Sequence, residues 1–91
     1  MPYTLIYPDS YIRRAKKFLR KHPKIHKQYK KTLQLLELDP YHPSLRLHCL
    51  EGRLKALSSV SINMGYRIVL ELEIQDEEIV LINIGSHDQV Y

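Results

Sequence analysis

The chain has 91 residues, of which 44% are hydrophobic, and a formal net charge of +4. This length predicts one compact domain over residues 1–91, and this hydrophobic content argues against intrinsic disorder. No apolar run approaches the roughly 20 residues that cross a bilayer, and the first residues lack the pattern of a signal peptide. We therefore expect a cytoplasmic protein with no membrane contact.

The chain contains a single cysteine, Cys49. One cysteine excludes an intramolecular disulfide and a cysteine-rich zinc site. A small packed thiol is a more usual role for such a residue than a nucleophile.

Charge is distributed unevenly along the chain. Residues 1–31 contain ten Lys or Arg and one acid, which gives +9, whereas residues 32–91 contain four Lys or Arg and nine acids, which gives −5; the two sum to the net +4. A cationic block of this kind attracts polyanions. A solvated basic helix face is the alternative interpretation.

The first third of the chain predicts a strand and a helix. Residues 3–7 are aromatic or β-branched except for Leu5 and lie between two prolines, which is typical of a short strand. Asp9 and Ser10 then offer an N-cap. Pro23 is expected to end the helix near His22. The apolar residues of this helix recur at helical spacing: Ile12, Ala15, Phe18 and Leu19.

A second helix is expected from about Lys24 to Pro40. The two helices would form an αα-hairpin that is basic outside and apolar inside. The expected buried stripe of the second helix comprises Ile25, Tyr29, Leu33 and Leu36.

From residue 45 the hydrophobic period changes from helical to alternating. Residues 45–50 predict a short extended piece, and residues 54–62 predict a strand that carries Ser59 and Ser61 on one face. A turn at residues 63–65 leads to a clearly alternating strand over 66–74. Residues 75–78 turn the chain again, and the almost wholly apolar residues 79–84 are typical of a central strand.

The predicted order is β-α-α-β-β-β, an α+β fold. Three sequential strands joined by short turns favour an antiparallel meander. We expect the N-terminal strand to join the edge of this small, mainly antiparallel sheet, and the αα-hairpin to cover one face.

Two histidines, an arginine and a terminal tyrosine could together cleave RNA. Attack by the 2′-hydroxyl needs a base, departure of the 5′-oxygen needs an acid, and histidine serves either role at neutral pH. His48 lies in an apolar context, where a histidine is usually structural, while His87 follows a strand end. Arg67 could hold a phosphate through its fork of N–H donors, with Tyr91 near the same site. We expect no metal or other cofactor, since the chain has no HExxH or CxxC pattern.

Three short segments resemble the RelE/ParE toxin superfamily, in particular its YafQ-like branch. Residues 47–55 (LHCLEGRLK) resemble a turn motif of these toxins, and residues 61–70 (SINMGYRIVL) are similar to their central strand. The end of the chain, residues 82–91 (INIGSHDQVY), is similar to the terminus of the YafQ-like branch. The three segments occur in the family order, so the resemblance covers nearly the whole chain and implies the RelE-like microbial ribonuclease fold.

The resemblance implies roles for individual residues. His48 and His87 fall on catalytic histidines of the YafQ-like branch, and we assign the base to His48 and the acid to His87. Tyr91 matches an aromatic residue that orients the substrate, and Arg67 matches a phosphate-binding arginine of other branches. The expected substrate-binding residues are Arg53, Lys55 and Ser61.

The sequence departs from the YafQ-like pattern at two positions. Ser61 and Gly65 stand where that branch has another histidine and an aspartate. Arg67 could compensate, but the departure leaves the assignment of base and acid open.

The resemblance also implies partners. Toxins of this family cut mRNA in the ribosomal A site, and an antitoxin protein binds and neutralises them. We therefore expect a metal-independent endoribonuclease, an mRNA interferase, that forms a toxin–antitoxin hetero-oligomer and acts on mRNA at the ribosome.

Other functions remain open at this point. A ParE-like inhibitor of DNA gyrase would have the same fold without a nuclease site. A non-enzymatic module could bind nucleic acid through the cationic hairpin. A toxin that has lost its activity is a further alternative.

Overall fold

The computed structural model describes residues 2–50 and 56–86. Its strands and helices follow in the order β1 (Thr4–Ile6), α1 (Asp9–Lys21), α2 (His26–Leu38), β2 (His48–Cys49), β3 (Ser58–Ser61), β4 (Tyr66–Glu73) and β5 (Glu78–Ser86). Short 3₁₀ helices span Pro23–Ile25 and Pro43–Leu45. No helix of these residues has the length and apolar character that a membrane span requires.

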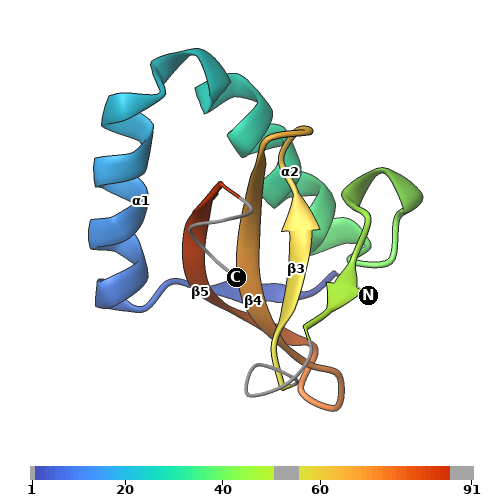
Figure 1. Cartoon of the computed structure of the whole chain (residues 1–91). Coiled ribbons are helices and arrows are strands. Elements are labelled where there is room, and N and C mark those ends of the chain that lie inside the picture. The colour runs from blue at the N-terminus through green and yellow to red at the C-terminus, as the bar shows by residue number, and fades with distance from the viewer. Residues whose placement is uncertain (1, 51–55, 87–91) are drawn as a thin grey trace.

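The strands form one five-stranded sheet in the order β1-β5-β4-β3-β2. Strands β2 to β5 pair antiparallel in sequence order, and β1 pairs in parallel with β5. The α+β class, the antiparallel meander and the N-terminal strand at its edge are therefore confirmed. Figure 1 shows α1 alongside β5 and α2 behind the sheet.

The helices differ from the prediction at their starts. The expected N-cap at Asp9 or Ser10 is wrong, because α1 has Pro8 as its N-cap and begins at Asp9. Asp9 instead lies in the first turn, where a carboxylate is favoured by the helix dipole. The second helix begins at His26 rather than Lys24, since a 3₁₀ turn that starts with Pro23 precedes it.

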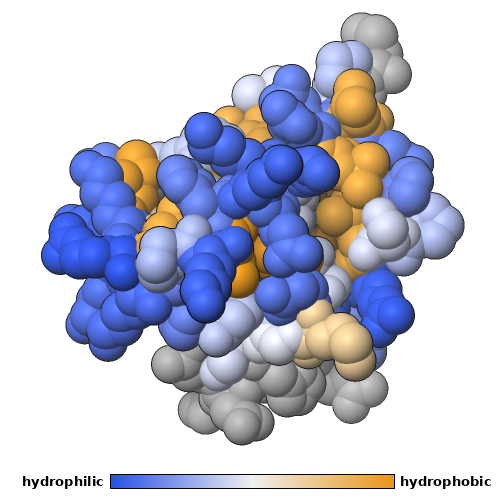
Figure 2. All heavy atoms as spheres, turned by 90° about the horizontal axis from the view of Figure 1, so that it is seen from above, coloured by the Kyte–Doolittle hydropathy of each residue, from blue (hydrophilic) through white to orange (hydrophobic). Residues whose placement is uncertain are grey.

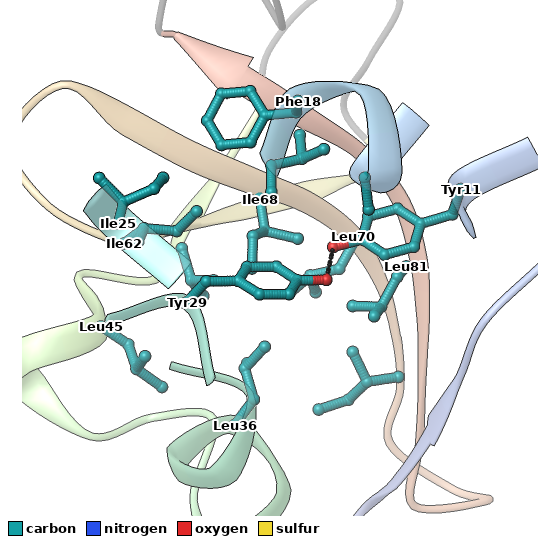
Figure 3. Close-up of a cluster of buried hydrophobic side chains, with 14 residues drawn as sticks. Tyr11, Phe18, Ile25, Tyr29, Leu36, Leu45, Ile62, Ile68, Leu70 and Leu81 are labelled. Atoms are coloured by element: carbon teal, nitrogen blue, oxygen red, sulfur yellow. Dashed lines mark hydrogen bonds between the residues drawn. The ribbon is translucent and has the colours of Figure 1, made fainter. Parts of the chain in front are cut away.

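The helices pack on one face of the sheet and form the main core (Figure 3). In α1, Ala15 and Phe18 are buried as expected, while Tyr11 is also buried and Ile12 and Leu19 are half-buried. The stripe of α2 is confirmed, with Leu33 its one half-buried member. Buried side chains of the sheet complete this core: Val60, Ile68, Leu70, Ile79, Leu81 and Ile84.

A smaller apolar cluster lies on the opposite face, which we call the second face. It consists of Leu50 and Val69, with Leu57 and Ile82 against them. Ile82 reaches this face through a bulge, because Val69 pairs with Asn83 whereas the next residue of β4 pairs with Leu81. Part of the second face is therefore already covered by apolar side chains.

The segment before β2 is less extended than predicted. Residues 45–50 were expected to be extended, but Leu45 ends a 3₁₀ helix and Arg46 is left-handed with φ of 50°. The strand comprises only His48 and Cys49. The expected strand over 54–62 is observed at Ser58–Ser61, and the expected turn at residues 51–52 lies outside the described residues.

A buried hydrogen bond joins the two helices. The hydroxyl oxygens of Tyr11 and Tyr29 are 2.8 Å apart (Figure 3). Burial raises the pKa of both phenols above the usual value, so the folded chain holds both protons where the unfolded chain would release them.

We predict that Tyr11→Phe lowers the free energy of unfolding by about 1 kcal/mol at neutral pH, the usual net contribution of one hydrogen bond. Stability of the parent protein should also fall as pH rises above about 10, where unfolded tyrosine ionises. This alkaline slope should be smaller in the variant. Urea unfolding across pH 7 to 11 measures both effects, and identical alkaline slopes would contradict the account.

Candidate active site on the second face of the sheet

Three of the predicted site residues lie on neighbouring strands of the sheet. His48 is opposite Ser59 in the β2–β3 pair, and Ser61 is opposite Arg67 in the β3–β4 pair. Directly opposed residues in an antiparallel pair point to the same face, as do alternate residues of one strand. The register therefore directs His48, Ser59, Ser61 and Arg67 to the second face.

The guanidinium of Arg67 crosses the sheet from β4 towards β2. Its Nε donates to the hydroxyl oxygen of Ser59 at 3.0 Å, and its Nη2 donates to the carbonyl oxygen of Arg46 at 3.0 Å. Nη2 also lies 3.4 Å from the Ser59 carbonyl oxygen. These bonds leave both N–H groups of Nη1 without a partner among the described residues.

The Arg46 carbonyl belongs to a residue with an unfavourable backbone conformation. A left-handed conformation costs a residue with a side chain about 1 kcal/mol, and Arg46 adopts it with φ of 50° and ψ of 51°. The bond from Arg67 offsets part of this cost. It also fixes the segment two residues before His48.

His48 is exposed on the short edge strand. Two residues of chain span at most about 7 Å, so the backbone of His48 lies within that distance of the Arg46 segment that Arg67 contacts. An imidazole in this position is open to solvent and to a ligand on the second face. His48 is therefore not buried as a structural histidine in an apolar context usually is, because its strand has only two residues and lies at the edge of the sheet.

Ser61 lies at the end of β3, where its hydroxyl is already engaged. It donates to the carbonyl oxygen of Asn63 at 2.6 Å. The side chain of Asn63 accepts from the backbone N–H groups of Gly65 and Tyr66, at 2.8 and 2.9 Å. Ser61 therefore holds the predicted β3–β4 turn, which is confirmed, and retains only acceptor capacity for a ligand.

The other predicted site residues are His87, Tyr91, Arg53 and Lys55, and all four lie outside the described residues. Strand β5 ends at Ser86, which pairs with Tyr66, and Gly85 pairs with Arg67. The last described residues of the chain are thus next to Arg67.

Sequence reasoning did not include Ser59 or the Arg46 carbonyl in the site. The alternation of residues 54–62 did place Ser59 on the same face as Ser61. Ser59 is fully buried in the structure, where a serine hydroxyl needs a polar partner, but its burial could not be predicted from the serine-rich segment around it. No sequence pattern indicates the left-handed Arg46.

Within residues 2–50 and 56–86, no group of three or more His, Cys, Asp or Glu side chains is arranged to hold a metal ion. Cys49 is exposed, and its sulfur is 3.8 Å from the hydroxyl oxygen of Ser58. The polar groups that the described part of the site offers are an imidazole, a guanidinium and serine hydroxyls. These groups can exchange protons and bind an anion.

Solved toxin structures share this fold over nearly the whole chain. YafQ from Escherichia coli is 15% identical with a TM-score of 0.79, and 98% of each chain is covered. A metal-bound toxin from Helicobacter pylori is 23% identical with a TM-score of 0.76, and 100% of each chain is covered. In a DinJ–YafQ toxin–antitoxin complex from E. coli, the matched chain is 17% identical with a TM-score of 0.78, and 100% of this chain and 99% of that one are covered.

No family model and no curated protein matches the sequence. The structural matches confirm the RelE-like fold that the three sequence segments predicted. At these identities, the likeness establishes the fold, whereas function depends on the site.

We predict that Arg67→Lys loosens β2 while leaving the rest of the sheet intact. Lysine keeps the charge but cannot donate simultaneously from the two fixed guanidinium nitrogens that contact Ser59 and Arg46. Amide hydrogen exchange at His48 and Leu50, whose N–H groups face β3, should become at least about tenfold faster, as expected for the loss of about 1.4 kcal/mol of local protection. Amides shared by β4 and β5 should exchange as before.

The matched control is Arg13→Lys, which makes the same change at an exposed position of α1. Unchanged exchange at His48 and Leu50 in the Arg67 variant would show that the guanidinium does not hold this strand.

Proposed function

We propose that the chain is a RelE/ParE-superfamily toxin of the YafQ-like branch, with residues 1–91 as its single domain, and that it cleaves mRNA without a metal ion. The observation that carries this proposal is the placement of His48 and Arg67 on the same face of the sheet, with His48 exposed and Arg67 fixed by Ser59 and Arg46. The fold shared with solved toxins supports it.

The proposed reaction begins at the ribose 2′-hydroxyl. His48 takes the proton as the oxygen attacks the adjacent phosphorus, and the bond from phosphorus to the 5′-oxygen breaks. The products are a 2′,3′-cyclic phosphate and a free 5′-hydroxyl. An exposed imidazole on an edge strand suits the base, because the RNA can approach it from solvent.

Arg67 would stabilise the charge on the phosphate. The two N–H groups of Nη1, which have no partner in the described part of the chain, would donate to the phosphate, while Nε and Nη2 keep the guanidinium fixed. A donor held in place before the reaction stabilises developing charge without reorganisation at the transition state. Arg67 would therefore position the site through Nε and Nη2 and stabilise the phosphate charge through Nη1.

The remaining roles fall to residues assigned by the sequence. His87 would protonate the departing 5′-oxygen, and Tyr91 would orient the substrate. Arg53 and Lys55 would add positive charge for substrate binding, and the Ser61 oxygen would act as an acceptor. The end of β5 beside Arg67 supports a terminal segment that contributes to this site.

The proposal includes the partners of a type II toxin. An antitoxin protein would bind the chain and neutralise it, and mRNA on the ribosome in the cytoplasm would be its substrate. The structurally similar YafQ chain was solved in a complex with DinJ, which supports this form of regulation.

We predict that His48→Ala slows mRNA cleavage by about 10²- to 10⁴-fold, the usual contribution of one general acid or base. The side chain is exposed, so thermal stability should change little. Cleavage can be followed by mapping mRNA 5′ ends after induction in cells without antitoxin, and with purified ribosomes.

His26→Ala is the matched control, because His26 is also exposed but lies at the start of α2. Equal cleavage by both variants would exclude His48 as the base. Inhibition of DNA gyrase with intact mRNA would instead support the ParE-like alternative.

Chelation tests the proposed independence from metal. We predict that EDTA leaves the cleavage rate of purified protein on a minimal RNA unchanged, since imidazole and guanidinium groups supply the proton transfer and charge stabilisation. The test is informative because a toxin of the same fold, from Helicobacter pylori, was solved with a bound metal. A rate that falls with EDTA and returns with added metal would contradict the mechanism.

A further inference from the structure

A groove of about 300 Å³ lies between α1 and the free edge of β5. Strand β1 pairs with β5 only from Glu78 to Val80, so beyond that point α1 rather than another strand flanks this edge. The groove is lined by Arg14, Lys17, Phe18, Lys21, His22, Asn83 and Ile84. The lining includes three permanently charged cations and no carboxylate.

The three cations come from one face of α1. Arg14, Lys17 and Lys21 are spaced by three and four residues, which brings them to the same side of the helix. Hydrophilic residues crowd the left of Figure 2, the side on which α1 lies in Figure 1. Because Arg14, Lys17 and Lys21 share one side of α1, their positive charges are concentrated at the groove.

Arg14 is held at the groove by the sheet. Its Nη1 donates to the carbonyl oxygen of Ile82 at 3.1 Å. This bond occupies an edge carbonyl that an added peptide strand would need, which disfavours binding of a peptide by strand addition. The other N–H groups of the guanidinium can still reach an anion.

The groove is also lined by aromatic side chains. The ring of His22 lies 4.6 Å from that of Phe18 and 4.7 Å from that of Tyr66, between centroids. The Tyr66 hydroxyl oxygen is 3.2 Å from His22 Nδ1, which fixes the imidazole. Of these rings, Phe18 and His22 line the groove, and with Ile84 and the amide of Asn83 they offer a planar base both apolar contact and hydrogen-bonding groups.

We propose that this groove binds a nucleotide of single-stranded RNA outside the cleaved bond. Phosphates would contact Arg14, Lys17 and Lys21, and a base would lie against Phe18 and His22. This inference rests on the proposed function in taking RNA as the ligand. The free edge of β5 separates the two sites: Ile84, which lines the groove, packs in the core under the helices, and the next residue, Gly85, pairs with Arg67 of the second face, so one strand of RNA would pass over this edge to occupy both.

A binding experiment tests the groove independently of cleavage. The probe is a short, fluorescently labelled 2′-O-methyl RNA, which lacks the attacking hydroxyl and so is not cut by the proposed reaction. The test variant is Lys17→Glu with Lys21→Glu. Its control is Lys16→Glu with Arg20→Glu, which makes the same charge change on the same helix at exposed residues outside the groove lining.

We expect the groove variant to weaken binding by at least about tenfold more than its control, as measured by anisotropy. The slope of log affinity against log salt should fall by about 0.7 for each phosphate that the variant no longer neutralises. In the parent protein, NMR signals of His22 and Asn83 should shift on titration with the probe.

Equal weakening in the two variants, or no shift at His22 and Asn83, would overturn the inference. A groove variant that binds the RNA like its control but no longer binds an antitoxin would assign the groove to protein instead. If the protein binds RNA through the groove but cuts no mRNA, only the nuclease proposal is refuted. If it cuts mRNA but its RNA binding does not depend on the groove, only this inference is refuted.

Discussion

The hydrogen bonds of the Arg67 guanidinium connect three segments that the chain brings together only on folding. They join β4 to the buried Ser59 of β3 and to the Arg46 carbonyl ahead of β2. A strand of two residues has little pairing of its own, so its position depends on such anchors. The placement of His48 relative to a bound phosphate therefore depends on Arg67.

The two faces of the sheet differ in what covers them. One face is fully engaged by the helices, whose packing includes the Tyr11–Tyr29 bond. The other has a small apolar cluster beside exposed polar groups. Because the helices hold the sheet from behind, the second face can hold donors such as Arg67 Nη1 that have no partner among residues 2–50 and 56–86. The free edge of β5 adds a cationic groove between these two regions.

The sequence predicted most of the fold, because alternation and helical spacing depend on local pattern. It placed Ser59 and Ser61 on one face of their strand, and the register confirms this alternation and adds Arg67 to the same face. It did not predict the left-handed Arg46, the bulge at Ile82 or the partnership of Ser59, since each depends on contacts between distant strands. The roles of His87 and Tyr91 stay predictions that rest on resemblance.

The most direct test of the account is a structure of the protein bound to an RNA with a 2′-deoxy substitution at the cleaved position. We predict a phosphate within hydrogen-bonding distance of Arg67 Nη1, and the 2′ carbon of the preceding sugar facing the imidazole of His48. An RNA that binds without reaching the second face, touching neither Arg67 nor His48, would contradict the central claim.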